Sequence, residues 1–176
     1  MIKRYGVIGC GMMGQEHLRN INLINDAIAY AIYEPNINMQ KMAKKLAPDA
    51  KFYDSLDKIL SDENIDCWLI VSPNHLHMDQ LEQLAGIPHR PILVEKPLFT
   101  EIKHLERIKN FSIKYSAPVW VAMEYRYMPP IAELIKRQNN VTGGIKMLSI
   151  REHRFPFLPK VDDWNRFNKN SGGTFV

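Results

Sequence analysis

The sequence has few cysteines and lacks both long apolar runs and long runs of one charge. Cys10 and Cys67 are the two cysteines among 176 residues, and neither stands in a C-x-x-C pair, so that metal-binding signature is absent. No apolar run approaches the ~18 residues of a membrane span. No block of like charges occurs, and the net charge of +4 is too small to indicate a nucleic-acid or membrane partner.

The start of the chain bears on where the protein resides. Met1–Arg4 lead directly into the first expected strand and leave no room for a signal peptide. Two small thiols that we expect to be buried suit a reducing compartment. A composition of 45% hydrophobic and 24% charged residues is ordinary for a globular protein. We therefore expect a cytoplasmic protein with one domain and part of another.

Short apolar segments alternate with segments of helical periodicity six times along the chain. The apolar segments lack in-out alternation, which indicates strands buried on both faces of a parallel sheet. Between them, apolar residues recur at helical spacing, as in Leu18 and Ile21 or in Met39, Met42 and Ala43. This order predicts an α/β fold of the Rossmann type, a doubly wound parallel sheet with right-handed crossovers. The expected strands are 5–8, 27–33, 51–53, 66–71, 91–94 and 118–122.

A glycine loop links the first expected strand to the first expected helix. Gly9 permits a tight turn, Gly11 lets the backbone approach a pyrophosphate, and Gly14 lets the helix pack closely on the strand. The helix N-terminus offers free N–H groups to phosphates. Glu34 follows 20 positions after Gly14, as the ribose-binding acid of a dinucleotide-binding fingerprint does, although a tight turn without a ligand is the alternative. The loop consists of Gly9, Cys10, Gly11, Met12, Met13 and Gly14.

Polar clusters follow three of the other expected strands. Ser72–His77 follow the fourth strand, Glu95 and Lys96 the fifth, and Glu124–Arg126 the sixth. Ligands of doubly wound sheets bind beyond the carboxyl ends of the strands, so these clusters and the glycine loop predict one binding edge. The two histidines of the first cluster are either catalytic or hydrogen-bonded structural residues, and the structural interpretation is favoured.

The pattern changes after Arg126. Pro129 and Pro130 mark a boundary, and we expect domains at 1–122 and 123–176. The second is expected to be the incomplete beginning of an α+β domain with an antiparallel sheet. Apolar and polar residues alternate imperfectly in segment 145–155, which is typical of a strand with one solvent-exposed face. A single strand cannot pair its backbone groups, so its apolar side chains need partners from further residues of the gene product or from another protomer. Those side chains are Leu148, Ile150, Phe155 and Phe157.

Together with these features, the triplet Glu95-Lys96-Pro97 makes the chain similar to a known family. The chain resembles the glucose-fructose oxidoreductase and inositol dehydrogenase (Gfo/Idh/MocA) family over its whole length. Members of that family are NAD(P)-dependent oxidoreductases that act mostly on sugars, polyols and their acids. The motifs that carry the resemblance are the glycine loop, Ser72–His77, Glu95–Pro97, Glu124–Tyr127, Trp164 with Arg166, and Ser171–Thr174.

The resemblance implies roles for individual residues. Lys96 matches the lysine that sits beside the nicotinamide and binds the reacting hydroxyl, so it is the expected catalytic residue and belongs to both the cofactor and the substrate site. Glu95 and Pro97 match positions that shape the nicotinamide ribose pocket. The other cofactor-binding residues, beside Glu34 and the glycine loop, are Ser72, Pro73, Asn74, His77 and Arg126. The other substrate-binding residues are Tyr125, Trp164 and Arg166.

One function is expected, and one alternative stays open. The expected function is that of an NAD-dependent dehydrogenase that transfers a hydride between nicotinamide and a secondary alcohol of a sugar, polyol or related acid. Glu34 can accept both ribose hydroxyls and repels a 2′-phosphate, which favours NAD over NADP. The alternative is a non-catalytic dinucleotide-binding protein.

The alternative follows from a departure from the family. In catalytic relatives the Gly-Gly segment leads into a helix with a downstream Asp or Lys and a His, and this chain stops at Val176 before those positions. We therefore expect a fragment of a longer enzyme that is a homo-oligomer when full length and binds no metal, nucleic acid or membrane.

Overall fold

The chain forms two units, which are described separately. The computed structural model describes residues 1–138, 144, 146–151, 161, 164 and 167–171. One unit comprises Met1–Ala122 with Lys160–Val176, and the other comprises Met123–Pro159. The first boundary falls after Ala122, as the sequence suggests, whereas the segment from Lys160 groups with the first unit. The assignment of functional domains stays a prediction.

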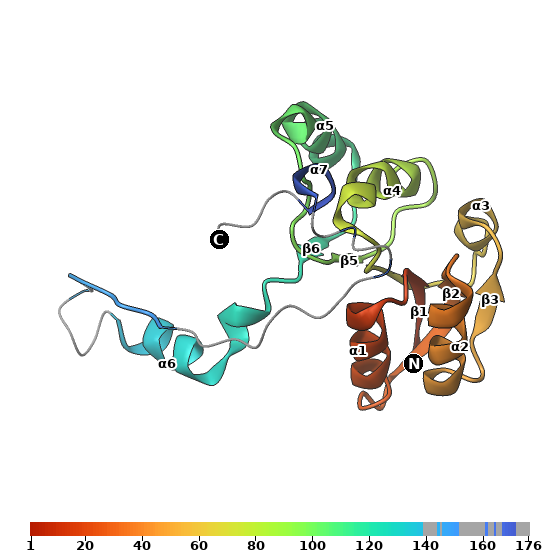
Figure 1. The fold of residues 1–176 in the computed structure, drawn as a ribbon, viewed down its shortest axis with the longest axis horizontal. Coiled ribbons are helices and arrows are strands. Elements are labelled where there is room, and N and C mark those ends of the chain that lie inside the picture. The colour runs from red at the N-terminus through yellow and green to blue at the C-terminus, as the bar shows by residue number, and fades with distance from the viewer. Residues whose placement is uncertain (139–143, 145, 152–160, 162–163, 165–166, 172–176) are drawn as a thin grey trace. The chain divides into compact units, whose positions relative to one another are not determined.

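A parallel sheet is the centre of the first unit. Within the described residues, six parallel strands are arranged in the order β3-β2-β1-β4-β5-β6 (Figure 1). The Rossmann-type sheet predicted from the sequence is thus confirmed. The strands are β1 (Lys3–Ile8), β2 (Ala27–Tyr33), β3 (Lys51–Tyr53), β4 (Cys67–Ile70), β5 (Ile92–Val94) and β6 (Val119–Val121).

The strands end level with one another. Ile8 of β1 pairs with Tyr33 of β2 and with Ile70 of β4. Ile70 pairs in turn with Val94 of β5, and Val94 pairs with Val121 of β6. Because these strands are parallel, the segments that follow them all begin at one edge of the sheet, the carboxyl edge.

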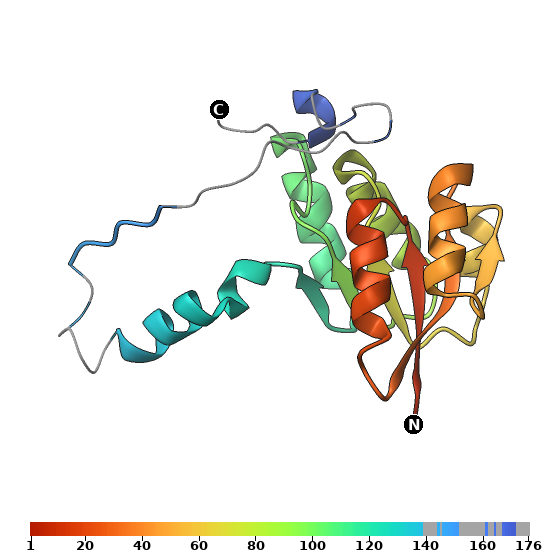
Figure 2. The same ribbon diagram turned by 60° about the horizontal axis from the view of Figure 1, so that its bottom comes forward.

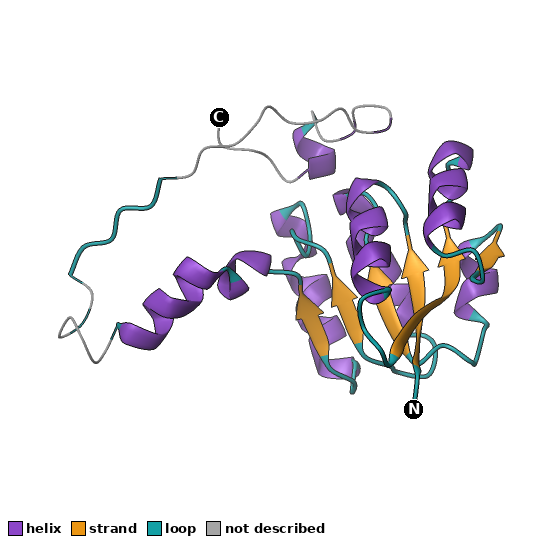
Figure 3. Ribbon diagram, turned by 90° about the horizontal axis from the view of Figure 1, so that it is seen from below, coloured by secondary structure: helices purple, strands orange, loops and turns teal. Residues whose placement is uncertain are grey.

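Helices cover both faces of the sheet, as Figures 2 and 3 show. None of the helices formed by the described residues is long and apolar enough to cross a membrane. The helices of the first unit are α1 (Met12–Ile21), α2 (Ile37–Leu46), α3 (Leu56–Leu60), α4 (His77–Leu84), α5 (Leu105–Lys114) and α7 (Asn168–Ser171), with the short 3-10 helices η1 (Asn74–Leu76) and η2 (Ile102–His104).

Two cores, one on each face, explain why the strands are apolar throughout. Val7 of β1 packs with Leu18 of α1 and with Ala43 of α2. Its neighbour Ile8 belongs to the other core, which includes Leu81 of α4. Successive side chains of a strand point to opposite faces, so both positions must be apolar when both faces are covered.

The buried face of α2 is narrower than the sequence suggests. Ala43 is fully buried and Leu46 packs against the same core, but Met42 is 40% exposed. Helical spacing predicts which face is buried, whereas the width of the buried stripe depends on how closely the helix approaches the sheet. The N-terminus of α2 is capped by Asn36, whose side chain accepts hydrogen bonds from the N–H groups of Asn38 and Met39.

The second unit contains η3 (Glu124–Tyr127) and α6 (Pro129–Arg137). The strand expected at 145–155 is not formed by its described residues, 146–151, which have no regular structure. Leu148 and Ile150 are 51% and 65% exposed. The described part of this unit offers no second strand for pairing, and an unpaired strand is unstable in water. Phe155 and Phe157 lie outside the described residues.

Gly6 makes room for a buried tryptophan, a role that we did not predict from the sequence. A Cβ at Gly6 would lie 2.7 Å from Cζ3 of Trp68 and 2.8 Å from Cδ1 of Ile65. Trp68 is fully buried at the adjacent position of β4. The missing side chain in β1 is therefore a packing requirement of the core.

We expect Gly6→Ala to lower the free energy of unfolding by about 1–3 kcal/mol, because the added methyl group overpacks the core against Trp68. The same substitution should cost clearly less in a Trp68→Leu background, where the indole ring is gone. Urea denaturation of the four proteins of this double-mutant cycle measures the coupling. An equal cost of Gly6→Ala in both backgrounds would contradict the explanation.

Candidate functional site

The candidate site lies at the carboxyl edge, where the loops after β1, β2, β4 and β5 come together. The turn at Gly9 depends on glycine for two reasons. Its φ is +93°, and a Cβ would lie 2.6 Å from the backbone N of Ser72. A Cβ at Gly14 would lie 2.6 Å from the carbonyl oxygen of Gly9. The loop after β1 is therefore packed tightly against the end of β4 and beneath the first turn of α1.

Gly11, by contrast, faces open space. No described atom lies within 4 Å of a Cβ built at this position. Gly11 is also the N-cap of α1, no described side chain caps that helix, and its first turn has no acidic residue. The N–H groups of the first turn and the positive end of the helix dipole are therefore available to an anion. This geometry fits the phosphates of a dinucleotide, with Met12 and Met13 supplying backbone N–H groups.

The Glu34 carboxylate joins the end of β2 to the glycine loop. The side chain is 8% exposed. Its Oε2 accepts a hydrogen bond from the N–H of Cys10 at 2.5 Å, and its Oε1 accepts one from the N–H of Asn36 at 2.7 Å. A carboxylate has about four lone-pair positions, so two acceptor positions remain for hydroxyl groups such as those of a ribose.

Cys10 itself is buried in the glycine loop. Burial raises the pKa of its thiol, and the nearby Glu34 charge raises it further. The thiol is therefore not a nucleophile, and the contribution of Cys10 to the site is its backbone.

Glu95 is held at the end of β5 by a residue that we did not predict from the sequence. Nε2 of His17 in α1 lies 2.8 Å from Oε1 of Glu95, and the N–H of Lys96 donates to Oε2 at 3.2 Å. Burial is the largest single influence on the pKa of Glu95 and acts to raise it, but the hydrogen bonds and electrostatic attraction of His17 and Lys96 together outweigh it, so that pKa is lowered. An ionised carboxylate only accepts hydrogen bonds, so His17 is the donor.

His77 has a structural role at the end of β4. Its ring is fully buried, with Nδ1 2.9 Å from the carbonyl oxygen of Pro97 and Nε2 3.0 Å from that of Ser72. Both ring nitrogens thus already face main-chain carbonyls, and the cofactor contact expected for His77 stays a prediction. The Ser72 hydroxyl donates to Oε1 of buried Gln80 at 2.6 Å, which also gives Ser72 a structural role.

Lys96 is the exposed member of the triplet at this edge. Among the described residues its ammonium group has no hydrogen-bond or salt-bridge partner. The peptide bond between Lys96 and Pro97 is cis. The ammonium group of Lys96 is therefore available to a ligand bound at the carboxyl edge.

The segment with α7 packs beside η1 in the first unit. The side-chain amide of Asn74 donates to the carbonyl of Ser171 at 3.0 Å, and the rings of His75 and Trp164 lie 6.5 Å apart. Trp164 is therefore close to the loop that includes Pro73 and Asn74, and its place on the substrate side stays a prediction. Tyr125 and Arg126 belong to η3 of the second unit. Arg166 lies outside the described residues.

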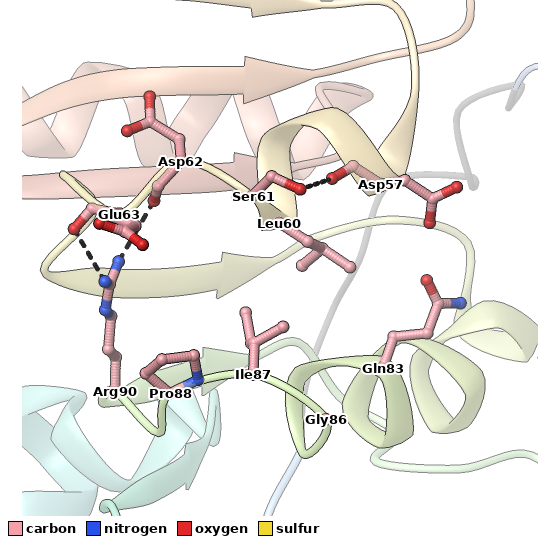
Figure 4. Close-up of a pocket in the computed structure, with 10 residues that line it drawn as sticks. All are labelled: Asp57, Leu60, Ser61, Asp62, Glu63, Gln83, Gly86, Ile87, Pro88 and Arg90. Carbon is pink, nitrogen blue, oxygen red and sulfur yellow. Dashed lines mark hydrogen bonds between the residues drawn. The ribbon is translucent and has the colours of Figure 1, made fainter.

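A hollow of about 490 Å³ lies elsewhere on the first unit (Figure 4). Its lining comes from segments that precede β4 and β5, so it is at the opposite edge of the sheet. Arg90 in this hollow donates to the carbonyl oxygens of Asp62 and Glu63, at 3.3 and 2.8 Å, and so connects the two segments. The lining residues are Asp57, Leu60, Ser61, Asp62, Glu63, Gln83, Gly86, Ile87, Pro88 and Arg90.

Comparison with known proteins shows the family. Residues 3–123 match the Gfo/Idh/MocA family model, described as an oxidoreductase family with an NAD-binding Rossmann fold. The chain belongs to this family, so the resemblance stated from the sequence is confirmed.

Named relatives are sugar and inositol dehydrogenases. The chain is 27% identical to myo-inositol 2-dehydrogenase of Thermotoga maritima, over 98% of this chain and 50% of the relative. It is 31% identical to inositol 2-dehydrogenase of Paracoccus denitrificans, over 89% and 47%. It is 26% identical to glucose-6-phosphate 3-dehydrogenase of Bacillus subtilis, over 86% and 42%. The chain thus spans about half the length of these relatives.

Solved structures show the same fold. Myo-inositol dehydrogenase from Lactobacillus casei, in complex with NAD(H) and myo-inositol, superposes with a TM-score of 0.75 at 26% identity, over 82% of this chain and 43% of that one. The WlbA dehydrogenase from Bordetella pertussis superposes with a TM-score of 0.70 at 22% identity, over 78% and 42%. The second match is a likeness of fold alone.

The buried His77 ring predicts a pH dependence of stability. Burial is the largest influence on the pKa of His77 and lowers it below 6.5, although the two carbonyl contacts oppose the effect. Below pH 6.5 the unfolded chain therefore binds more protons than the folded one. The free energy of unfolding should fall as the pH drops through that window, by at most about 1.4 kcal/mol per pH unit for one group.

We expect His77→Gln to remove this contribution, because its amide can donate to one of the carbonyls but does not titrate. Urea denaturation of both proteins between neutral pH and pH 5 measures the difference. The wild-type protein should lose more stability than the variant on acidification. Parallel pH profiles would contradict the assignment.

Proposed function

We propose that this chain is the dinucleotide-binding part of an NAD-dependent dehydrogenase that acts on a secondary alcohol of a sugar, polyol or related acid. The observation that carries the proposal is the arrangement at the carboxyl edge, where an open helix N-terminus, a buried acid and an unpartnered lysine follow three strands of one sheet. The names of the relatives support the substrate class, since they include inositol 2-dehydrogenase and glucose-6-phosphate 3-dehydrogenase.

The cofactor would be held by three parts of this edge. The loop from Gly9 to Gly14 and the first turn of α1 would hold the diphosphate, and Glu34 would accept the hydroxyls of the adenosine ribose. Pro73, Asn74 and the segment from Glu95 to Pro97 would enclose the nicotinamide half. When bound, NAD supplies the acceptor for a hydride.

Lys96 would bind the reacting oxygen of the substrate. Its ammonium would donate a hydrogen bond to the hydroxyl, orient the alcohol carbon, and stabilise the negative charge that develops on the oxygen as its proton leaves. The family resemblance also assigns Arg126 to the nicotinamide end and Tyr125, Trp164 and Arg166 to the substrate side, and these roles stay predictions.

The proposal also covers the cellular location, the oligomeric state and the partners of the protein. We place it in the cytoplasm, because Cys10 and Cys67 are free thiols in the part of the chain that the structure describes. The full-length protein is proposed to be a homo-oligomer with a small-molecule substrate and without a nucleic-acid or membrane partner.

We expect this chain to bind NAD more tightly than NADP, because Glu34 would repel a 2′-phosphate. Glu34→Gln should relax the preference by about 1–2 kcal/mol, the scale of a hydrogen bond to a charged group. The amide oxygen of this variant can still accept from Cys10, whereas Glu34→Ala would also leave the N–H groups of Cys10 and Asn36 unpaired. Calorimetric titration with both dinucleotides measures the preference. Equal or tighter binding of NADP to the wild-type chain would refute the role of Glu34.

We expect Lys96→Ala to lower the rate of hydride transfer by a factor on the order of 10² while NAD affinity changes little, because the lysine acts on the substrate. NADH formation with inositols and glucose 6-phosphate as probes measures turnover of the full-length protein that contains this chain, and titration measures affinity. Lys109→Ala, on the exposed face of α5, is the matched control. NAD binding without turnover of any probe would favour the non-catalytic alternative, and unchanged turnover in the variant would remove Lys96 from the mechanism.

A further inference from the structure

Two histidines from different helices hold the segment that carries Lys96. His17 of α1 contacts Glu95 on one side of the lysine, at 2.8 Å. His77, the first residue of α4, contacts the carbonyl of Pro97 on the other side, at 2.9 Å. The main chain is therefore held immediately before and immediately after Lys96.

The His17 contact is largely protected from water. The side chains of His17 and Glu95 are 18% and 9% exposed, so their hydrogen bond is stronger than a surface pair would be. The second oxygen of Glu95 accepts the N–H of Lys96 itself. The chain of contacts thus runs from the imidazole of His17 through the carboxylate to the backbone of the lysine.

The backbone matters for Lys96 because its side chain has no other described anchor. A lysine has a flexible stem, and the direction in which it leaves the main chain decides which positions its ammonium can reach. A carboxylate that is fixed on one side and a carbonyl that is fixed on the other restrict that direction.

Helix α1 also connects this support to the phosphate-binding end of the site. Its N-terminus begins at Met12, and His17 follows five residues later on the same helix. At 1.5 Å per residue, the two are separated by about 7.5 Å along a rigid helix axis. One helix therefore sets the spacing between the place for the diphosphate and the Glu95–Pro97 segment.

We propose that His17 is a positioning residue for the nicotinamide half of the site, which it orders through Glu95 and the main chain of Lys96. The inference rests on the proposed function, since it assumes that a dinucleotide binds at the carboxyl edge. His17 touches neither cofactor nor substrate in this role. It supports binding of the nicotinamide half, which would lie at the Glu95–Pro97 segment, and does not affect binding of the adenosine half.

The test compares two ligands on the full chain by calorimetric titration. NADH reaches both halves of the site, whereas ADP reaches the glycine loop and Glu34. His17→Ala should weaken NADH binding about tenfold, the size of a lost hydrogen bond to a charged group, and leave ADP affinity unchanged. His17→Gln should restore NADH binding, because its amide can donate to Glu95. His89→Ala is the control, since His89 contacts Ser116 and the carbonyl of Ala85 instead and should change neither affinity.

The outcomes separate this inference from the proposed function. A general loss of structure would weaken NADH and ADP equally, and that result, or no change for either ligand, would overturn the positioning role. If His17→Ala does not fold, His17→Leu preserves the packed volume without the donor and gives the same comparison. A wild-type chain that binds neither ligand would instead refute the proposed function, and the inference with it.

Discussion

The close approach of the glycine loop to the end of β4 is the constraint on which the rest of the site depends. Gly9 turns with a positive φ and has no room for a Cβ against Ser72, so α1 begins at the carboxyl edge of the sheet. The same turn brings the N–H of Cys10 to Glu34 and the carbonyl of Gly9 against Gly14. Contacts within the protein therefore hold the loops after β1, β2 and β4 to one another without a bound ligand.

Three buried polar side chains at this edge, those of Glu34, Gln80 and Glu95, are paired. Glu34 and Glu95 each accept two hydrogen bonds, and Gln80 accepts one from Ser72. Burying such groups is costly unless they are paired, so each pair also holds its loop in place. Within the described residues, the α1 N-terminus at Gly11 and the ammonium of Lys96 are left open, the first suited to an anion and the second to a negative charge that develops on oxygen. The edge thus combines a rigid frame with two chemically available groups.

Sequence reasoning predicted which residues gather at the carboxyl edge better than it predicted what each of them contacts. Glu34 could be predicted from its spacing to Gly14, but its hydrogen bond to Cys10 could not. His77 was expected both as a candidate for cofactor binding and as a structural residue, and its burial supports the structural role. His17 gave no signal except its place one turn after Gly14. The strand expected at 145–155 depended on pairing partners, which the described residues of that unit do not include.

The sequence by itself determined the order of strands and helices, the parallel sheet and the place of the glycine loop, because periodicity and turn chemistry are local properties of the chain. Only the tertiary structure decided which polar side chains stay open and which are occupied by contacts within the protein. That outcome depends on which helix passes above which strand end. His17 and Glu95 are 78 residues apart in the sequence and 2.8 Å apart at their polar atoms, a distance that no local pattern encodes.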